Sequence, residues 1–368
     1  MIEDTQARND GQGRRVTILS HQDDLDGVAS AVVADRYLRG QGVVPNVCFV
    51  SYETIDVEVE RLGASEDELW IMDLSLKDPG LIKHLRRFGP EKLFIFDHHS
   101  SSVQAMASWQ PFATILFDDS GNRCATDLVY GFVRETLGWD DLGALGPMVD
   151  AAHSRDLWIR DVQAGDDLTV MICQKDAHWM FGLLQGDPTL ASPANYTAGM
   201  YEAMQEAESA RQESIALANA SEVTLKYRMH PITRELFDPP VTLVCALSNG
   251  FSSDVAHALL DGNGHRWVAL IDVDRLRLSF RTNDETIQAT GVSAKELAES
   301  IPGGGGHPCA AGSALPPEIL RGGPNALVEF LDQRVGAIWQ SNHANPCREI
   351  EVREPTRRFF TVSAASPV

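Results

Sequence analysis

The feature that most constrains this chain is a short apolar run that ends abruptly in ionisable residues. Leu93-Phe94-Ile95-Phe96 has the character of a buried strand, and Asp97-His98-His99 follows it at once. Desolvating three such side chains is costly unless something pairs them, and a divalent metal would do so. In open parallel sheets, ligands gather beyond the carboxyl ends of the strands, which is where this triplet falls.

Other apolar segments predict strands at 16–20, 46–50, 68–73, 92–97 and 114–117, separated by helical or turn-rich stretches. This alternation predicts an α/β fold with a doubly wound parallel sheet. Three of the strands end in residues that bind metals: His21 follows the first, Asp73 closes the third and Asp97 begins the triplet after the fourth. Because the carboxyl ends of parallel strands share one edge of a sheet, we expect these side chains to converge.

Two further polar clusters lie in apolar surroundings. His21-Gln22-Asp23-Asp24-Leu25-Asp26-Gly27 follows the first strand and leads into a helical pattern that reaches residue 40. Gly27 would let the chain turn tightly into that helix. The second cluster, 150–158, contains three candidate metal ligands, Asp150, His153 and Asp156.

The ligand-type residues of these segments supply oxygen and nitrogen donors without thiolates. This chemistry suits manganese or magnesium better than a structural zinc, and the participation of imidazole favours manganese. Two metals that share a bridging carboxylate would need a donor set of this kind. The six cysteines form no Cys-x-x-Cys pair, which indicates structural thiols. The donors are His21, Asp24, Asp26, Asp73, Asp97, His98, Asp150 and Asp156.

The remainder of the chain predicts a helical connection and a second α/β unit. We place the catalytic domain at 15–160, the helical connection at 161–235, a smaller C-terminal domain at 236–342 and an unassigned tail at 343–368. The second unit contains four consecutive glycines, 303–306, followed by His307. Such a run can present several backbone N–H groups to an anion.

These motifs together resemble the DHH phosphoesterase family, including its associated C-terminal domain. The resemblance rests on His21 with Asp24-x-Asp26-Gly27, Asp73 at a strand end, Asp97-His98-His99, the acidic motif at 150–156 and Gly-Gly-Gly-His-x-x-Ala-Ala-Gly at 304–312. It covers residues 15–315 with the motifs in the family's order. The resemblance implies a catalytic N-terminal α/β domain, a smaller substrate-binding C-terminal domain and a dimetal site in the cleft between them.

Carried over to this sequence, the resemblance implies a role for each residue of the dimetal site. His21 and Asp24 would hold one metal, Asp26 and His98 the other, and Asp73 would bridge them. The fourth motif would supply one more ligand.

For that fourth ligand we favour Asp156, which closes a Ser-Arg-Asp-Leu-Trp loop, over Asp150, which would sit in the preceding helix. For His153, the sequence supports a metal ligand and a hydrogen-bonded core residue equally. Asp23 either replaces a ligand or is solvated.

The resemblance also implies contacts with the substrate. His99 would face the phosphate, and Asp97 would orient the histidines or lie near the metals. Asp97, His99 and Asp73 are the predicted catalytic residues. Arg281 of Ser279-Phe280-Arg281 and His307 would bind the non-scissile part of the substrate, beside Gly304, Gly305 and Gly306.

The net charge of −21 argues against avid binding of long nucleic acid, because the field of the whole molecule repels polyanions. The same repulsion is a smaller obstacle to the binding of a short nucleotide. No run of about 18 apolar residues exists and the first fifteen residues are polar, so we expect a cytoplasmic protein without membrane contact. The resemblance is compatible with a homodimer.

The sequence therefore predicts a manganese-dependent phosphodiesterase that hydrolyses short nucleotides, either oligoribonucleotides or linear or cyclic dinucleotides, through a water activated by two metals. One alternative is a phosphomonoesterase acting on a bisphosphonucleotide, another small phosphate ester or polyphosphate. The other is a degenerate member that binds nucleic acid or a partner without catalysis.

Overall fold

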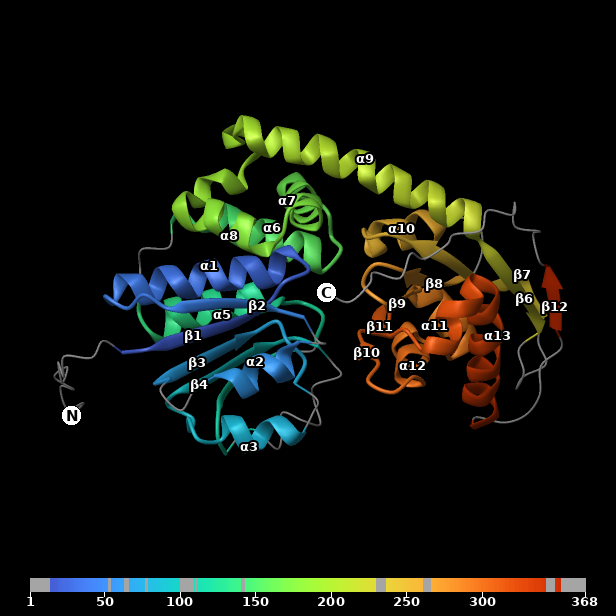
Figure 1. Cartoon of the computed structure of the whole chain (residues 1–368), viewed down its shortest axis with the longest axis horizontal. Coiled ribbons are helices and arrows are strands. Elements are labelled where there is room, and N and C mark those ends of the chain that lie inside the picture. Colours follow the sequence, from blue (N-terminus) through green and yellow to red (C-terminus); the bar gives the residue numbers. More distant parts are fainter. Residues whose placement is uncertain are drawn as a thin grey trace, which may run out of the picture. The chain divides into compact units, whose positions relative to one another are not determined.

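The chain forms two compact units, residues 1–208 and 209–368, each with its own sheet and apolar core (Figure 1). The structure is a computed structural model that describes residues 14–51, 54–62, 66–76, 79–99, 109, 111–118, 120–139, 143–229, 236–260, 266–341 and 348–351. All but four residues of the predicted tail, 343–368, lie outside this description.

The first unit confirms the predicted parallel sheet. Its five strands run in the order β2-β1-β3-β4-β5, and every neighbouring pair is parallel. Each predicted strand agrees with an observed one to within one residue at either end. The strands are β1 (Val16–His21), β2 (Asn46–Val50), β3 (Glu68–Met72), β4 (Leu93–Asp97) and β5 (Thr114–Phe117).

Helices cover both faces of this sheet, because its strands are apolar on both sides. Side chains from one face join a core with α1 (Leu25–Gly40), α5 (Ala125–Gly131), α6 (Gly146–Asp156), α7 (Gln163–Gln174), α8 (Ala177–Gly186) and the start of α9 (Ala198–Ser221). The opposite face packs against α2 (Ile55–Arg61) and α3 (Ile82–Leu85), and Figure 1 shows α1 and α3 on opposite sides. Shorter helical segments are Pro79–Leu81, Phe132–Thr136, Pro188–Ala191 and Pro193–Asn195.

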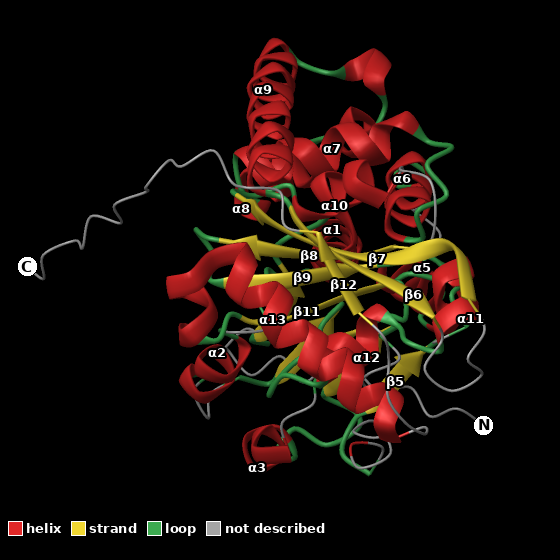
Figure 2. Cartoon of the chain, turned by 90° about the vertical axis from the view of Figure 1, so that its right-hand side faces the viewer, coloured by secondary structure: helices red, strands yellow, loops and turns green. Residues whose placement is uncertain are grey.

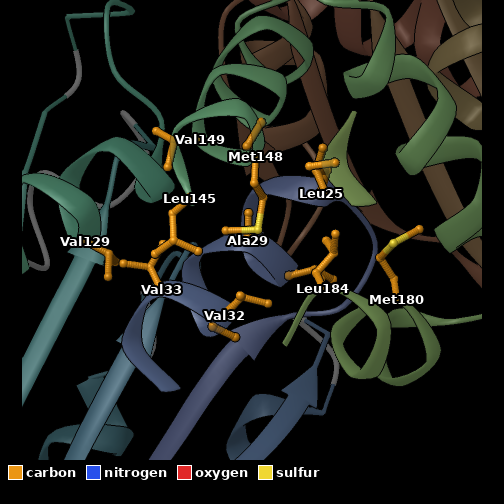
Figure 3. Packing of buried hydrophobic residues seen from close by; sticks show 14 of the residues in the cluster. Leu25, Ala29, Val32, Val33, Val129, Leu145, Met148, Val149, Met180 and Leu184 are labelled. Carbon is orange, nitrogen blue, oxygen red and sulfur yellow. The ribbon is translucent and has the colours of Figure 1, made fainter. Parts of the chain in front are cut away.

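α1 is buried on most of its surface, which fixes the loop that precedes it. Ala29, Val32 and Val33 pack among side chains of α6 and α8, including Met148 and Leu184 (Figure 3). Small and β-branched side chains let these helices approach closely. The acidic residues at the start of α1 are therefore attached to a rigid element.

The second unit is built on a seven-stranded sheet in the order β10-β11-β9-β8-β7-β6-β12. Its strands are β6 (Val223–Met229), β7 (Leu236–Ser248), β8 (Arg266–Asp272), β9 (Arg277–Arg281), β10 (Gly305–Gly306), β11 (Ala310–Ala314) and β12 (Arg348–Glu351). Within the described pairs, β7 and β8 are parallel and the others antiparallel. Figure 2 shows α12 (Ala294–Glu299) and α13 (Pro317–Ser341) on the side of the sheet opposite α10 (Ser252–Leu260); α11 spans Asp284–Thr290.

The range predicted as a helical connection, 161–235, is divided between the two units. α7, α8 and the beginning of α9 share the core of the first unit, whereas β6 belongs to the second sheet. The prediction of a wholly helical range is therefore wrong at β6. Its alternately buried Val223, Leu225 and Tyr227 show the two-residue period of a strand. None of the helices in the described residues is long and apolar enough to span a membrane.

The junction between β1 and α1 leaves no room for a side chain at Gly27. A Cβ atom there would lie 2.1 Å from the carbonyl oxygen of His21, which is a backbone atom. We expect Gly27→Ala to lower the free energy of unfolding by about 1–3 kcal/mol, as overpacking does in other cores. Urea denaturation of the purified chain measures this change.

Gly182 of α8 is the matched control, because a Cβ at that position would meet no atom within 4 Å. Gly182→Ala should leave stability unchanged or raise it by up to about 1 kcal/mol, since alanine favours the helix. Equal effects of the two substitutions would contradict the close approach at Gly27.

Candidate metal centre at the switch point of the sheet

The strand order of the first unit creates a natural ligand site. From β1 the chain moves to β2 on one side, and it then crosses β1 to reach β3 on the other side. In sheets of this order, ligands bind at the carboxyl ends of β1 and β3, where the connections diverge. His21 is the last residue of β1, Asp73 directly follows β3, and Asp97 is the last residue of β4.

At the end of β1, the start of α1 orients His21. Asp24 is the N-cap of α1: its Oδ1 accepts a hydrogen bond from the backbone N–H of Gly27 at 3.0 Å, and its Oδ2 lies 2.9 Å from His21 Nδ1. Asp23 is more distant, with Oδ2 3.7 Å from His21 Nε2. Asp24 is therefore bonded directly to His21, whereas Asp23 lies at the margin of the site.

Asp73 lies between two histidines. Its Oδ2 is 3.3 Å from His21 Nδ1, and its Oδ1 is 3.3 Å from His98 Nε2. The backbone of Asp73 leaves the strand direction with a φ of 55°, while its N–H still donates to the Phe96 carbonyl at 2.9 Å. Asp73 was predicted as the last residue of the strand, but this left-handed turn places it just beyond β3.

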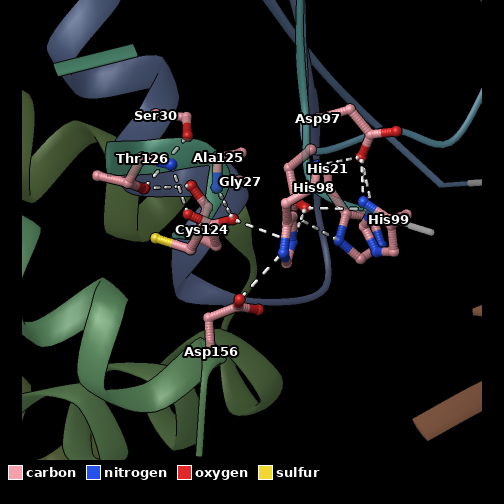
Figure 4. Close-up of polar contacts among 12 residues, drawn as sticks. His21, Gly27, Ser30, Asp97, His98, His99, Cys124, Ala125, Thr126 and Asp156 are labelled. Carbon is pink, nitrogen blue, oxygen red and sulfur yellow. Dashed lines mark hydrogen bonds and ion pairs between the residues drawn. The ribbon is translucent and has the colours of Figure 1, made fainter. Parts of the chain in front are cut away.

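A second group of donors surrounds His98. Its Nε2 lies 3.7 Å from Asp26 Oδ2 and 3.6 Å from Asp156 Oδ2 (Figure 4). The carboxylate of Asp26 is anchored by two backbone N–H groups at the start of α5, those of Ala125 at 2.8 Å and Thr126 at 2.7 Å. Asp26 and Asp156, which are remote in sequence, thus meet at one imidazole.

Asp97 organises the two histidines that follow it. Its Oδ1 accepts hydrogen bonds from the backbone N–H of His98 at 2.9 Å and of His99 at 3.2 Å, and it lies 2.6 Å from His99 Nδ1. Asp97 is fully buried. A carboxylate bound to Nδ1 places the imidazole proton on that nitrogen, so that Nε2 is the other ring nitrogen available for interaction.

The site concentrates buried negative charge. Burial alone would lower the pKa of His98, but the nearby carboxylates of Asp156, Asp73 and Asp26 outweigh it and raise the pKa to about 11. Burial, followed by the charge of Asp73, raises the pKa of Asp26 to about 6. Burial would likewise raise the pKa of Asp73, but the contacts with His21 and His98 hold it below its usual range. The cluster therefore favours additional positive charge.

The donor atoms fit divalent cations. His21, Asp24 and Asp73 contribute donors that all lie within 4.8 Å of one another, and so do Asp26, His98 and Asp156. Adjacent ligands of an ion with bonds of about 2.1 Å are separated by about 3 Å, comparable with the 3.3 Å contacts of Asp73. Among the described residues, Asp156 Oδ2 is buried and lacks a hydrogen-bond partner, as expected of an atom that binds an ion.

The three candidates of the fourth motif differ in their surroundings. Asp156 joins the cluster, Asp150 is exposed on α6, and His153 Nδ1 lies 2.7 Å from Asp127 Oδ2. The prediction that Asp156 closes a loop is wrong, because Asp156 is the last residue of α6. The helical spacing continues to this point, which places His153 and Asp156 one turn apart.

The start of α5 is the part of the site that the sequence did not reveal. Cys124, Ala125 and Thr126 have side chains of little chemical interest, and the contribution of Ala125 is a backbone N–H group. The available signal was Asp127 three residues after Cys124, a spacing typical of a helix start.

In the second unit, sheet pairing brings Arg281 beside the glycine segment. Arg281 pairs with Ala310 of β11, its Nη1 donates to the Phe280 carbonyl at 2.9 Å and its Nη2 to Ser253 Oγ at 2.8 Å. The backbone N–H of His307 donates to the Ala310 carbonyl at 2.7 Å. Arg281 thus lies beside the hairpin of β10 and β11, and His307 lies in its turn.

The glycines are more ordered than the predicted loop. Gly305 and Gly306 form β10, and the N–H of Gly304 donates to the Ile301 carbonyl at 3.0 Å. A Cβ at Gly304 would lie 1.9 Å from the Ala298 carbonyl oxygen. Close packing explains the glycine at 304, whose N–H is bonded within the unit, and the binding of an anion by this segment stays a prediction.

Comparisons with known proteins agree with this fold. No family model matches the sequence. Oligoribonuclease NrnB of Bacillus subtilis (strain 168) is 22% identical over 317 residues, which cover 82% of this chain and 73% of the relative. RecJ of Thermus thermophilus, in complex with Mn²⁺, has a TM-score of 0.58 and 14% identity, covering 92% of this chain and 54% of that one. An exonuclease RecJ bound to manganese has a TM-score of 0.53 and 13% identity, and the match covers 89% of this chain and 90% of that one.

This chain thus spans about half the length of the Thermus RecJ and most of NrnB. The two RecJ structures share its fold. The ordered motifs from His21 to the glycine signature at 304–312 agree with this similarity. The order of the motifs, the sequence similarity to NrnB and the RecJ fold thus all agree with the resemblance to the DHH phosphoesterases.

Proposed function

We propose that this protein is a divalent-metal-dependent phosphodiesterase that hydrolyses short nucleotides. The observation that carries the proposal is the position of Asp73, whose two carboxylate oxygens face different histidines at the carboxyl edge of the sheet. Each of those histidines lies beside further carboxylates. Two donor groups that share one carboxylate are the arrangement that a pair of neighbouring metal ions requires.

In this assignment, His21 and Asp24 hold one ion, and Asp26, His98 and Asp156 hold the other. Asp73, which contacts a histidine of each group, would be shared between the two positions. When bound, the ions supply Lewis acidity and an activated water for attack on phosphorus. Manganese is preferred over magnesium because both positions include an imidazole.

His99 and Asp97 act on the substrate side of the same strand end. The bond between Asp97 Oδ1 and His99 Nδ1 holds the ring, so that His99 in its imidazolium form can donate from Nε2 to a phosphoryl oxygen. Because Asp97 is fully buried, it positions His99 without contacting the substrate. The charge that develops on the phosphoryl oxygens would be stabilised by a donor already in place.

The choice of a short nucleotide rests on charge and on the curated relative. A net charge of −21 disfavours long polyanions, and the relative NrnB is named an oligoribonuclease. In the second unit, Arg281 and His307 are proposed to bind the non-scissile phosphate or sugar, beside Gly304–Gly306. The guanidinium of Arg281 suits a phosphate because it offers several donors in one plane.

A substrate panel tests the activity. With Mn²⁺ present, we expect short RNA or a dinucleotide to be cleaved to nucleoside monophosphates, identified by chromatography, and EDTA to abolish turnover. Cleavage of bisphosphonucleotide or polyphosphate alone would favour a phosphomonoesterase. Binding of short nucleotides without any hydrolysis would contradict the proposed enzyme.

Asp73→Asn, which removes the bridging charge, should lower kcat by at least about 100-fold.

The fourth-motif ligand can be identified within a single helix. Asp156→Asn should weaken Mn²⁺ binding by at least about tenfold, because a buried carboxylate beside His98 becomes a neutral amide. Asp150→Asn is the matched control on the exposed side of α6, and its affinity for Mn²⁺ should stay within about twofold of that of the wild type. Isothermal titration calorimetry measures both, and a stronger effect at Asp150 would refute the assignment of Asp156.

Metal binding should also stabilise the fold. At Mn²⁺ concentrations of about 100 times Kd, one site adds about 2.7 kcal/mol to the free energy of unfolding. We therefore expect a higher melting temperature in Mn²⁺ than in EDTA, observed by circular dichroism. Asp156→Asn should reduce this rise. An equal rise with Na⁺ at the same ionic strength would indicate charge screening instead of site binding.

A further inference from the structure

We propose that the hydrogen bond between Asp127 and His153 is a positioning device that sets the separation of Asp26 and Asp156, two carboxylates of one proposed metal position. This inference rests on the proposed function and deepens it. It assigns roles to two residues outside the donor set, one on α5 and one on α6. His153 then acts through its helix and is not itself a ligand.

The first part of the device is the start of α5, which holds Asp26. Besides the N–H groups of Ala125 and Thr126, the hydroxyl of Thr126 donates to the Asp26 carbonyl at 2.9 Å. That hydroxyl also lies 3.2 Å from Ser30 Oγ. Asp26, Ser30 and Thr126 are all buried. The side chain and the backbone of Asp26 are thereby fixed to one helical turn.

The second part joins that turn to α6. Asp127 Oδ2 accepts from the backbone N–H of Cys124 at 2.9 Å and lies 2.7 Å from His153 Nδ1. His153 precedes Asp156 by three residues in the same helix, so both side chains project from one face of α6. A rigid connection therefore runs from Asp26 through α5 to Asp127, His153 and Asp156.

A directional contact adds a constraint that the apolar packing between α5 and α6 does not supply. Val129 of α5 packs in the same cluster as Met148 and Val149 of α6 (Figure 3). Apolar packing is non-directional and tolerates small sliding or rotation. Asp156 lies at the very end of α6, and its Oδ2 is 3.6 Å from His98 Nε2, so a small rotation of the helix would open the cluster.

The competing interpretation is that His153 is itself a ligand. Donor atoms of Cys124, Asp127 and His153 lie within 4.8 Å of one another, which is compatible with a separate cation. The positioning role is favoured because the hydrogen bonds already account for Asp127 Oδ2, which serves both a helix cap and His153. The two interpretations differ in their response to an asparagine at position 153.

The experiment compares His153→Asn with His153→Leu. Asparagine places an amide N–H near the position of Nδ1 and can keep the bond to Asp127, whereas leucine cannot. We expect His153→Leu to weaken Mn²⁺ binding by about tenfold or more in calorimetry, as loss of an outer partner of a metal site does. The Mn²⁺ affinity of His153→Asn should remain within about twofold of that of the wild type. The Mn²⁺ concentration for half-maximal activity should shift in parallel.

His84 supplies the matched control. It lies on α3 with a side chain 29% exposed, close to the 34% of His153, and its Nε2 lies 3.6 Å from the carboxylate of Glu60. His84→Leu should leave Mn²⁺ affinity unchanged. Melting temperatures of all variants in EDTA separate a loss of metal affinity from a general loss of stability.

The outcomes separate this inference from the proposed function. If both variants at position 153 weaken Mn²⁺ binding equally, His153 is a ligand and the positioning role is overturned. If His153→Leu lowers the melting temperature in EDTA but leaves Mn²⁺ affinity within about twofold, the bond is only structural and the inference fails while the proposed function stands. A wild-type chain that binds no Mn²⁺ would overturn both.

Discussion

The contact of one buried carboxylate with two imidazoles organises the first unit. Asp73 reaches His21 with one oxygen and His98 with the other, each at 3.3 Å. Its left-handed backbone, with φ at 55°, costs about 1–3 kcal/mol for a residue other than glycine. Pairing of Asp73 N–H with the Phe96 carbonyl retains that conformation. The sheet therefore sustains a locally strained residue at its switch point, where ligands bind in folds of this kind.

Burial of charge explains the remaining features of the centre. An isolated carboxylate in an apolar interior is strongly unfavourable, so each buried acid needs a partner. The carboxylate of Asp26 accepts hydrogen bonds from two backbone N–H groups of α5. The carboxylate of Asp97 accepts from the backbone N–H groups of the two histidines that follow it, and that of Asp156 lies beside His98. The imidazoles compensate the negative charge only in part, which is why the pKa of His98 rises to about 11. The clustered carboxylates thus favour additional positive charge at this end of the sheet.

The success and failure of the sequence predictions follow from the range of the interactions involved. The strands of the first sheet are continuous apolar runs, and a strand buried on both faces leaves that pattern in its own residues. β6 was missed because its half-buried alternation follows directly on the long helix α9. The role of α5 could not be predicted, since backbone N–H groups have no side-chain signature. The packing that requires glycine at 304 could not be predicted, because it comes from the carbonyl of Ala298 on a neighbouring helix.

By itself, the sequence determined the parallel sheet, the residues at its strand ends and the chemical nature of the donors. These depend on local periodicity and on residue type, and both are present in short segments. Only the tertiary structure decided which residue of the fourth motif lies with Asp26 and His98: Asp156 does, whereas Asp150 remains exposed. It also revealed that Asp127 and His153 connect the two helices involved. The physical reason is that such pairings depend on strand order and helix packing between segments remote in sequence, which no local pattern records.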